Sequence, residues 1–99
     1  MKALTREAAH IKLDEVFDTL EDISRRENDT YDLNRIMLEV QEDDSITGVL
    51  LVVRGRGMLD HRHITWGISP YEKGIHSGHY DLSIGQAQID WLKRVDRGW

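Results

Sequence analysis

We expect this chain to fold as a small two-layer α+β domain with a long N-terminal helix, a three- to four-stranded antiparallel meander and a C-terminal helix. Three observations predict that class. Apolar residues near the N-terminus recur at the period of a helix, those in the middle of the chain alternate at the period of a strand, and a capping signal precedes a second amphipathic stretch. The 99 residues are expected to form a single domain, 1–99, with one core.

The first element predicted is an amphipathic helix of about five turns. Thr5 is a suitable N-cap, and apolar residues then recur at spacings of four and three from Ala9 to Ile23. The helix is expected to end near the segment RREND at 25–29. Basic side chains suit the negative end of a helix, and the following Asn-Asp pair favours a turn.

Three strands are predicted next. Residues 33–42 alternate, with Ile36 and Leu38 on one face, and residues 61–68 alternate again around Trp66. Between them VLLVVR at 49–54 is apolar on both faces, which is typical of a central strand. Residues 69–79 contain glycine and proline and are expected to form a loop, with at most a short extended piece at 79–82.

A final helix is predicted after Ser83, because Gln86 three residues later completes a capping box. Asp90 and Arg94 form an i,i+4 pair on it, and Gly98 is a candidate αL cap. Each helix has one apolar stripe, so we expect both to cover the same face of the sheet.

The other face of the sheet is then expected to be open and partly apolar. Val49, Leu51 and Val53 of the central strand would lie on it, together with Leu33 and Met37 of the first strand. Exposed apolar patches of this kind usually mark contact surfaces. The sequence therefore predicts a homodimer through the open sheet face, with two-fold symmetry.

Composition restricts the compartment and the classes of partner. The chain has no cysteine, which excludes disulfides and suits a reducing cytosol, and charged residues within the first fifteen positions leave no room for a secretory signal. We therefore expect a cytoplasmic protein. Its net charge of −5 argues against direct binding to nucleic acid or to an anionic membrane.

Four of the five histidines lie between residues 60 and 81. His61 and His63 are separated by one residue and would leave the same face of a strand, while His76 and His79 belong to the predicted loop, which could fold back toward them. Such a set could bind a divalent metal such as zinc. The plainer interpretation is that these are polar surface residues and that the protein has no cofactor.

The segment HITW at 63–66 matches the histidine, apolar, Ser/Thr, apolar tetrad of two-histidine phosphoesterases. In those enzymes the imidazoles act as acid and base across a phosphate. They need two copies of the tetrad, and the sequence contains one. Phosphoesterase chemistry would therefore require a dimer that places two copies of His63 across one cleft.

Arg54, Arg56 and Arg62 flank two glycines in the segment RGRGMLDHR. Backbone N–H groups of a glycine-rich turn and arginine side chains can bind an anion such as a nucleotide phosphate. The alternative is an ordinary hairpin turn with soluble ends.

Acidic side chains lie on the first helix opposite its apolar stripe, and the EDD segment at 42–44 extends the negative surface. A surface of this kind can dock onto a basic protein, although an ordinary solvated face is the simpler alternative. The candidate partner-binding residues are Asp14, Asp18, Glu21, Asp22, Glu42 and Asp43.

The predicted function is that of a non-enzymatic interaction module, a small inhibitor or adaptor that binds a basic partner through its acidic helix. Small phage-borne counter-defence proteins are of this general type. The alternative is that the protein binds a metal or a nucleotide phosphate, or acts as a phosphoesterase. It would use the strand face of His61 and His63 and the turn of Arg54 and Arg56.

Overall fold

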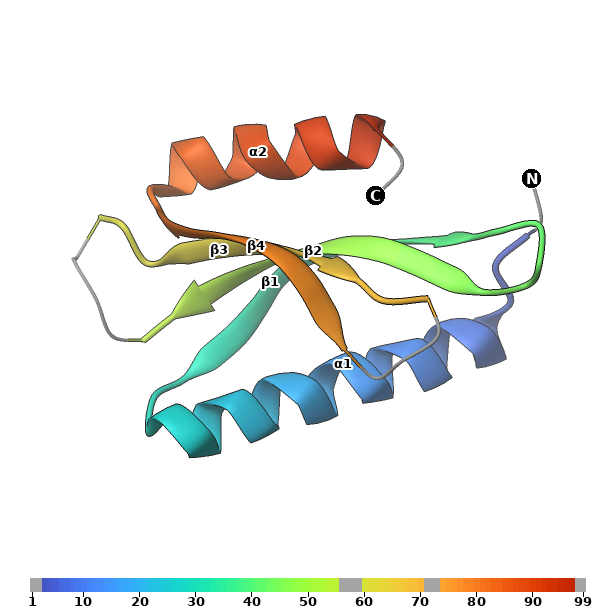
Figure 1. The fold of residues 1–99 in the computed structure, drawn as a ribbon, viewed down its shortest axis with the longest axis horizontal. Coiled ribbons are helices and arrows are strands. Elements are labelled where there is room, and N and C mark those ends of the chain that lie inside the picture. The colour runs from blue at the N-terminus through green and yellow to red at the C-terminus, as the bar shows by residue number, and fades with distance from the viewer. Residues whose placement is uncertain (1–2, 56–59, 71–73, 98–99) are drawn as a thin grey trace.

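The computed structural model describes residues 3–55, 60–70 and 74–97. It has an N-terminal helix, a four-stranded antiparallel sheet and a C-terminal helix, so the α+β class is confirmed (Figure 1). In chain order the elements are α1 (Arg6–Glu27), β1 (Tyr31–Val40), β2 (Ile46–Arg54), β3 (His63–Ile68), β4 (Ile75–Leu82) and α2 (Ile84–Asp96).

The sheet is a meander in which each strand pairs antiparallel with the next, in the order β1-β2-β3-β4. Strand β4 (Ile75–Leu82) occupies residues 75–79 of the segment expected as a loop and continues through the extended piece expected at 79–82. Its pairing with β3 shifts register twice, and Ser77 and Asp81 have φ angles of 54° and 56°. These irregularities and Gly78 conceal the strand, because they break the alternation by which strands are recognised.

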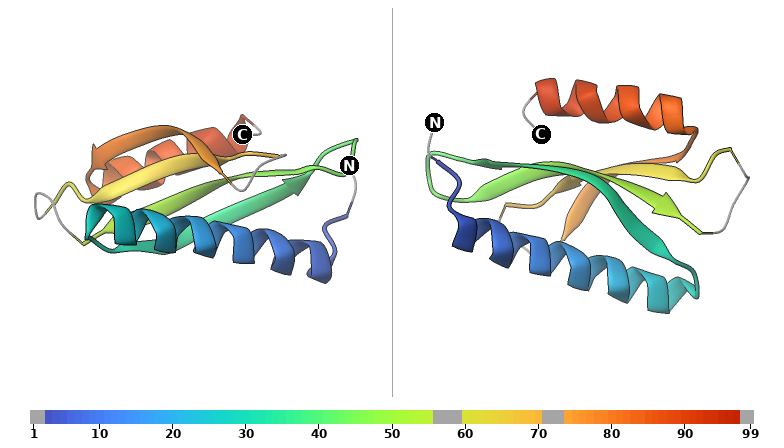
Figure 2. Two further views of the ribbon diagram at one scale, coloured as in Figure 1. Left: turned by 60° about the horizontal axis from the view of Figure 1, so that its bottom comes forward. Right: turned by 180° about the vertical axis from the view of Figure 1, so that it is seen from behind.

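The two helices lie on opposite faces of the sheet (Figures 1 and 2). On one side Val16 and Leu20 of α1 share a core with Leu50, Val52 and Trp66. On the other side α2 contacts β2, β3 and β4. The expectation that both helices cover one face is therefore wrong, and the domain has three layers.

The open sheet face expected from the sequence is also absent over β2, because Val49 and Leu51 are fully buried. The indole nitrogen of Trp91 in α2 donates a hydrogen bond to the Val49 carbonyl, at 3.1 Å. A strand that is apolar on both faces must be packed against another layer on each side of the sheet. Helix α1 forms one of these layers and helix α2 forms the other.

A β-bulge changes the side on which Leu33 lies. The register of β1 against β2 shifts between Leu33 and Arg35, so that Leu33 pairs with Val52 and packs against the α1 core. Strict alternation places Leu33 on the opposite face, and that expectation is wrong because Asn34 is an extra residue in the strand.

The predicted caps are present where the structure describes them. Thr5 accepts a hydrogen bond from the Ala8 amide at 3.1 Å, and α1 ends at Asn28 in the left-handed region. Ser83 and Gln86 form both bonds of the capping box. The candidate cap Gly98 lies outside the described residues.

The register of β1 against β2 gives a first prediction. A Cβ on Gly48 would lie 2.2 Å from the Met37 carbonyl oxygen, whereas one on Gly74 would meet no atom within 4 Å. We expect Gly48→Ala to lower the free energy of unfolding by about 1–3 kcal/mol through overpacking, and Gly74→Ala to change it much less. Urea denaturation measures both, and equal stability of the two variants would contradict this register.

Candidate functional site

Three of the four predicted histidines lie in the β3–β4 ladder, and His61 precedes it. Opposite residue pairs are His63 with Leu82, Thr65 with His79, and Gly67 with His76. Among residues 3–55, 60–70 and 74–97, no three His, Asp or Glu side chains lie close enough together to hold a metal ion. The structure therefore does not gather His61, His63, His76 and His79 into one ligand set, and the metal site stays a prediction.

Two of these histidines have neighbouring polar groups of another kind. The Nδ1 atom of His79 lies 2.8 Å from a carboxylate oxygen of Asp90, and that of His76 lies 3.0 Å from the Ser77 hydroxyl. His79 thus connects the edge strand β4 to helix α2.

The Asp90 contact belongs to a buried polar network between α2 and the sheet. Asp90 accepts hydrogen bonds from the Thr65 hydroxyl and from His79. Arg94, which is 3% exposed, donates to both the carbonyl and the hydroxyl of Thr65, at 3.1 Å each. The sequence indicates the Asp90–Arg94 pair, and it marks Thr65 only as the Ser/Thr position of the HITW tetrad, because no local pattern connects Thr65 to the final helix.

The network contains a hydroxyl, an imidazole and a carboxylate, yet its connections are not those of a nucleophilic triad. In a triad the imidazole contacts the hydroxyl and takes its proton. Here the carboxylate of Asp90 lies between Thr65 and His79, and Thr65 is fully buried. The arrangement holds α2 on the sheet.

The charges of the network are set by burial and by the hydrogen bonds. Burial alone would raise the pKa of Asp90, but hydrogen bonds from Thr65 and His79, with the nearby charges of His79 and Arg94, hold that pKa below its usual value. Burial lowers the pKa of Arg94, and the Asp90 carboxylate opposes that effect. Asp90 is therefore the counter-charge for a buried guanidinium.

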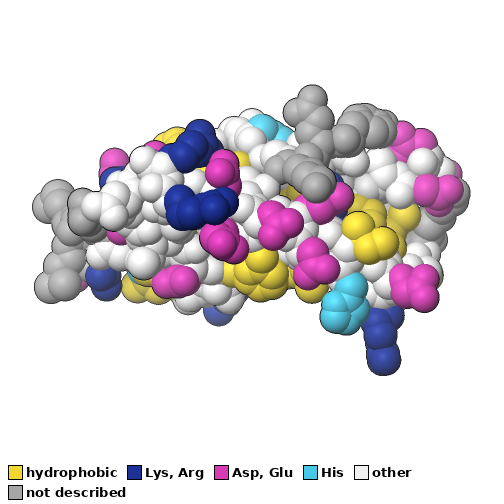
Figure 3. Space-filling view, turned by 90° about the horizontal axis from the view of Figure 1, so that it is seen from below, with side chains coloured by type: hydrophobic (Ala, Val, Ile, Leu, Met, Phe, Trp, Pro, Cys, Tyr) yellow, Lys and Arg dark blue, Asp and Glu magenta, His cyan; other side chains and the backbone are white. Residues whose placement is uncertain are grey.

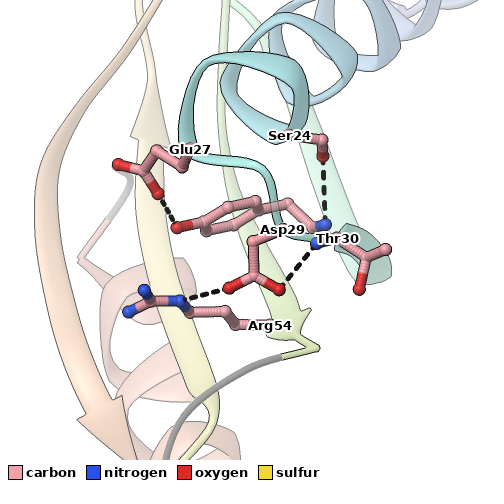
Figure 4. A network of polar contacts seen from close by, with 6 residues as sticks. Ser24, Glu27, Asp29, Thr30 and Arg54 are labelled. Carbon is pink, nitrogen blue, oxygen red and sulfur yellow. Dashed lines mark hydrogen bonds and ion pairs between the residues drawn. The ribbon is translucent and has the colours of Figure 1, made fainter.

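The predicted anion site is only partly described, because Arg56 lies outside the described residues. Arg54 has a structural role: its Nε donates to the Asp29 carboxylate at 2.9 Å and its guanidinium lies 5.8 Å from the centre of the Tyr31 ring (Figure 4). Asp29 also accepts from the Thr30 amide at 2.7 Å. An anion at Arg54 would compete with Asp29 for the charge of the guanidinium.

The same contacts hold the end of α1 against β1 and β2. The Ser24 hydroxyl oxygen accepts from the Tyr31 amide at 3.1 Å, and the Tyr31 hydroxyl donates to Glu27 (Figure 4). Burial, together with the Glu27 carboxylate, raises the pKa of Tyr31 to about 12. Tyr31 therefore stays a neutral hydrogen-bond donor.

Arg62 and His63 lie side by side in sequence and are half-buried. The Arg62 Nε and the His63 Nδ1 are shielded from solvent and have no hydrogen-bond partner among the described residues. Buried polar atoms without a partner are costly, so these two side chains are the part of the predicted histidine and arginine face that is least satisfied within the described residues.

The acidic side chains of α1 face outward, as the sequence predicts. Figure 3 shows acidic groups along this side of the molecule, with hydrophobic side chains beside them. Asp14, Asp18 and Glu21 are exposed. Asp22 is exposed too, but it forms ion pairs with Arg25 at 3.8 Å and Arg26 at 3.2 Å.

The two acidic residues predicted from the β1–β2 turn lie apart from the end of α1 that carries Asp22. Figure 1 shows this turn at the end of the molecule where the chain begins, opposite to the end where α1 stops. Glu42 is exposed. Asp43 accepts from the amide and the hydroxyl of Ser45, at 3.1 and 2.5 Å, so it stabilises the turn.

A groove between α1 and β4 adjoins the acidic surface, and sequence patterns give no sign of it. It consists of two hollows of about 430 and 450 Å³ that share Ile23, Arg26 and Ile75 as lining residues. Asp18 and Asp22 line the second hollow, and the first is lined by the aromatic residues Tyr31, Trp66 and Tyr80. Tyr80 is the exposed ring among them.

Comparison of the chain with protein-family models, with curated proteins and with solved structures gives no match. In the described part of the chain, neither helix combines the length and the apolar character needed to cross a membrane. The assignment of function therefore depends on the geometry of the described residues.

The buried network gives a second prediction. Asp90→Asn removes the counter-charge of Arg94 and weakens the hydrogen bonds from Thr65 and His79, so we expect it to lower the free energy of unfolding by about 2–4 kcal/mol at neutral pH. The folded state lowers the pKa of Asp90. Its contribution is therefore complete above the unfolded pKa of about 4 and is lost as the pH falls through the folded pKa.

Denaturation of the wild type and of Asp90→Asn across this range measures the effect. The difference in stability should be full at about pH 6 and should close as the pH falls below about 4. Asp96→Asn, an exposed position on the same helix, is the matched control. A stability difference that does not change with pH would contradict the role given to the Asp90 charge.

Proposed function

We propose that this protein is a non-enzymatic interaction module, an inhibitor or adaptor that binds a basic surface of a protein partner through α1. The observation that carries the proposal is the exposed acidic row of α1, formed by Asp14, Asp18 and Glu21 on the side away from the core. Like charges at i and i+4 cost a helix a few tenths of a kcal/mol. A cationic partner would remove that cost.

Charge supports the same class of partner. Over Arg6–Glu27 the helix carries seven acidic and four basic side chains, and the whole chain has a net charge of −5. The negative electrostatic field of these charges speeds the association with a basic protein, and it weakens as salt is added.

The groove beside α1 gives a route to specificity. Asp18, on its acidic side, can receive a lysine or arginine side chain, while Ile23 and Ile75 offer apolar contact to the stem of that side chain. A flat acidic helix would bind cations with little selectivity, whereas a groove next to it can select shape. We place this function in the cytoplasm, which the absence of cysteine favours.

A charge-matched comparison tests the proposal. The triple variant Asp14→Asn, Asp18→Asn, Glu21→Gln should lose at least about tenfold in affinity for basic partners captured from the native host, because it removes the central charges of the surface. The control variant Asp32→Asn, Asp60→Asn, Asp96→Asn removes three exposed acids elsewhere and should bind like the wild type. Binding is measured by interferometry at two salt concentrations. Equal binding by both variants would exclude α1 as the contact surface.

A second candidate function is supported by the partnerless atoms of Arg62 and His63. On this hypothesis the histidine and arginine face binds a divalent metal or a nucleotide phosphate. Zinc and ATP are the probes: a ligand should raise the melting temperature by several degrees, because ligands stabilise the state they bind. The rise should be lost in His61→Ala, His63→Ala and kept in His10→Ala. No shift with either probe would exclude this candidate.

A further inference from the structure

Helix α2 buries charged side chains and exposes apolar ones. Arg94 is 3% exposed, whereas Leu92 is 55%, Ile89 is 58% and Ile84 is 45% exposed. This is the reverse of the usual distribution, since arginine is among the residues least often buried and isoleucine among the most. The apolar side of α2 therefore contributes less to this chain's own core than its composition allows.

The exposed apolar residues share one side of the helix. Taking 100° per residue, Ile84, Leu92 and Ile89 fall within an arc of about 140° that excludes Ala87 and Arg94, which face the sheet. The exposed Asp96 lies within the same arc, one turn beyond Leu92. Gly85 belongs to the same side, and a Cβ built on it meets no atom within 4 Å. We call the set Ile84, Gly85, Ile89 and Leu92 the outer ridge of α2.

The buried network keeps the outer ridge facing solvent. Thr65 contacts both Asp90 and Arg94, and these two residues lie one turn apart on the side of α2 that faces the sheet. Turning Leu92 inward would break these bonds and leave a buried threonine and an arginine without their partners, which is costly. The ridge is therefore a fixed feature of the folded chain.

We infer that the outer ridge of α2 binds a second copy of this chain. The distribution of charge favours this occupant. Helix α2 has two acidic and two basic side chains and is neutral, whereas α1 has seven acidic and four basic. Two copies of a chain with net charge −5 repel each other least where their surfaces are neutral. A basic partner, by contrast, gains its electrostatic attraction at α1 and not at the neutral helix α2.

The ridge also suits contact with itself. Two α2 helices could pack antiparallel through their outer ridges, with a two-fold axis that crosses the pair at the height of Asp90 and Trp91. Ile89 of one copy then contacts Leu92 of the other, and the symmetry repeats this contact. Gly85 leaves room for a neighbouring side chain at the end of the contact. This surface replaces the open sheet face as the basis for a dimer, because α2 itself covers β2 on that side.

Sedimentation equilibrium of the full chain tests the inference. At about 100 µM we expect a mass of twice 11.5 kDa for the wild type. The variant Ile89→Glu, Leu92→Glu should sediment as a monomer, with a dissociation constant raised at least about a hundredfold by two buried charges. Ile11→Glu, at a 62% exposed isoleucine of α1, should remain dimeric. Circular dichroism checks that each variant is folded.

A cross-link gives a second readout that does not depend on a disruptive change. The chain has no cysteine of its own, so copies with Ile89→Cys mixed with copies with Leu92→Cys should form a disulfide between them under mild oxidation. Ile11→Cys copies should not. A monomeric wild type at 100 µM, a dimer that survives Ile89→Glu, Leu92→Glu, or equal cross-linking at Ile11→Cys would each overturn the inference.

Discussion

The central strand β2 is apolar on both faces, and that constraint determines how the rest of the chain is arranged. Leu50 and Val52 point to one side of the sheet and Val49 and Leu51 to the other, and all four are buried. A single helical layer would leave one pair in water, at a cost of about 1.5–3 kcal/mol for each side chain. The N-terminal and C-terminal helices therefore pack on opposite faces, and each presents a different outer surface.

The two helices are held in different ways. Helix α1 packs through aliphatic side chains, and polar contacts from Asp29, Tyr31 and Arg54 anchor its C-terminal end. Helix α2 covers Val49 and Leu51 of β2 and is also held by the buried bonds of Thr65, Asp90 and Arg94. A buried ion network specifies one orientation more strongly than it stabilises the fold. In this domain it fixes which side of α2 faces the sheet.

Much of the fold is readable from the sequence, because local patterns determine local structure. The helix caps at Thr5 and Ser83 and the apolar run of β2 predict the corresponding elements correctly. The bulge at Asn34 and the irregular strand β4 are hidden, since one extra residue reverses the alternation and positive φ angles interrupt it. The prediction that α2 lies on the same face of the sheet as α1 is wrong. Because β2 is apolar on both faces, each face must pack against another element. No local sequence pattern, however, shows on which face of the sheet a helix lies.

The candidate sites also contain features that local sequence predicts and features that depend on the tertiary structure. Exposure of Asp14, Asp18 and Glu21 follows from helical periodicity and is predictable. The groove between α1 and β4 and the contact of Thr65 with Asp90 depend on tertiary placement, because they join residues that are distant in sequence. Arg54 resembles an anion ligand in sequence, and only the structure shows that Asp29 occupies it.

Nuclear Overhauser effects from side chains of β3 test the three-layer arrangement most directly. Thr65 and Trp66 are neighbours on opposite faces of the sheet. The account predicts contacts from the Thr65 methyl group to Asp90 and Arg94 of α2, and from the Trp66 ring to Val16 or Leu20 of α1, with no contact from Trp66 to α2. Contacts from the Trp66 ring to both helices would contradict it.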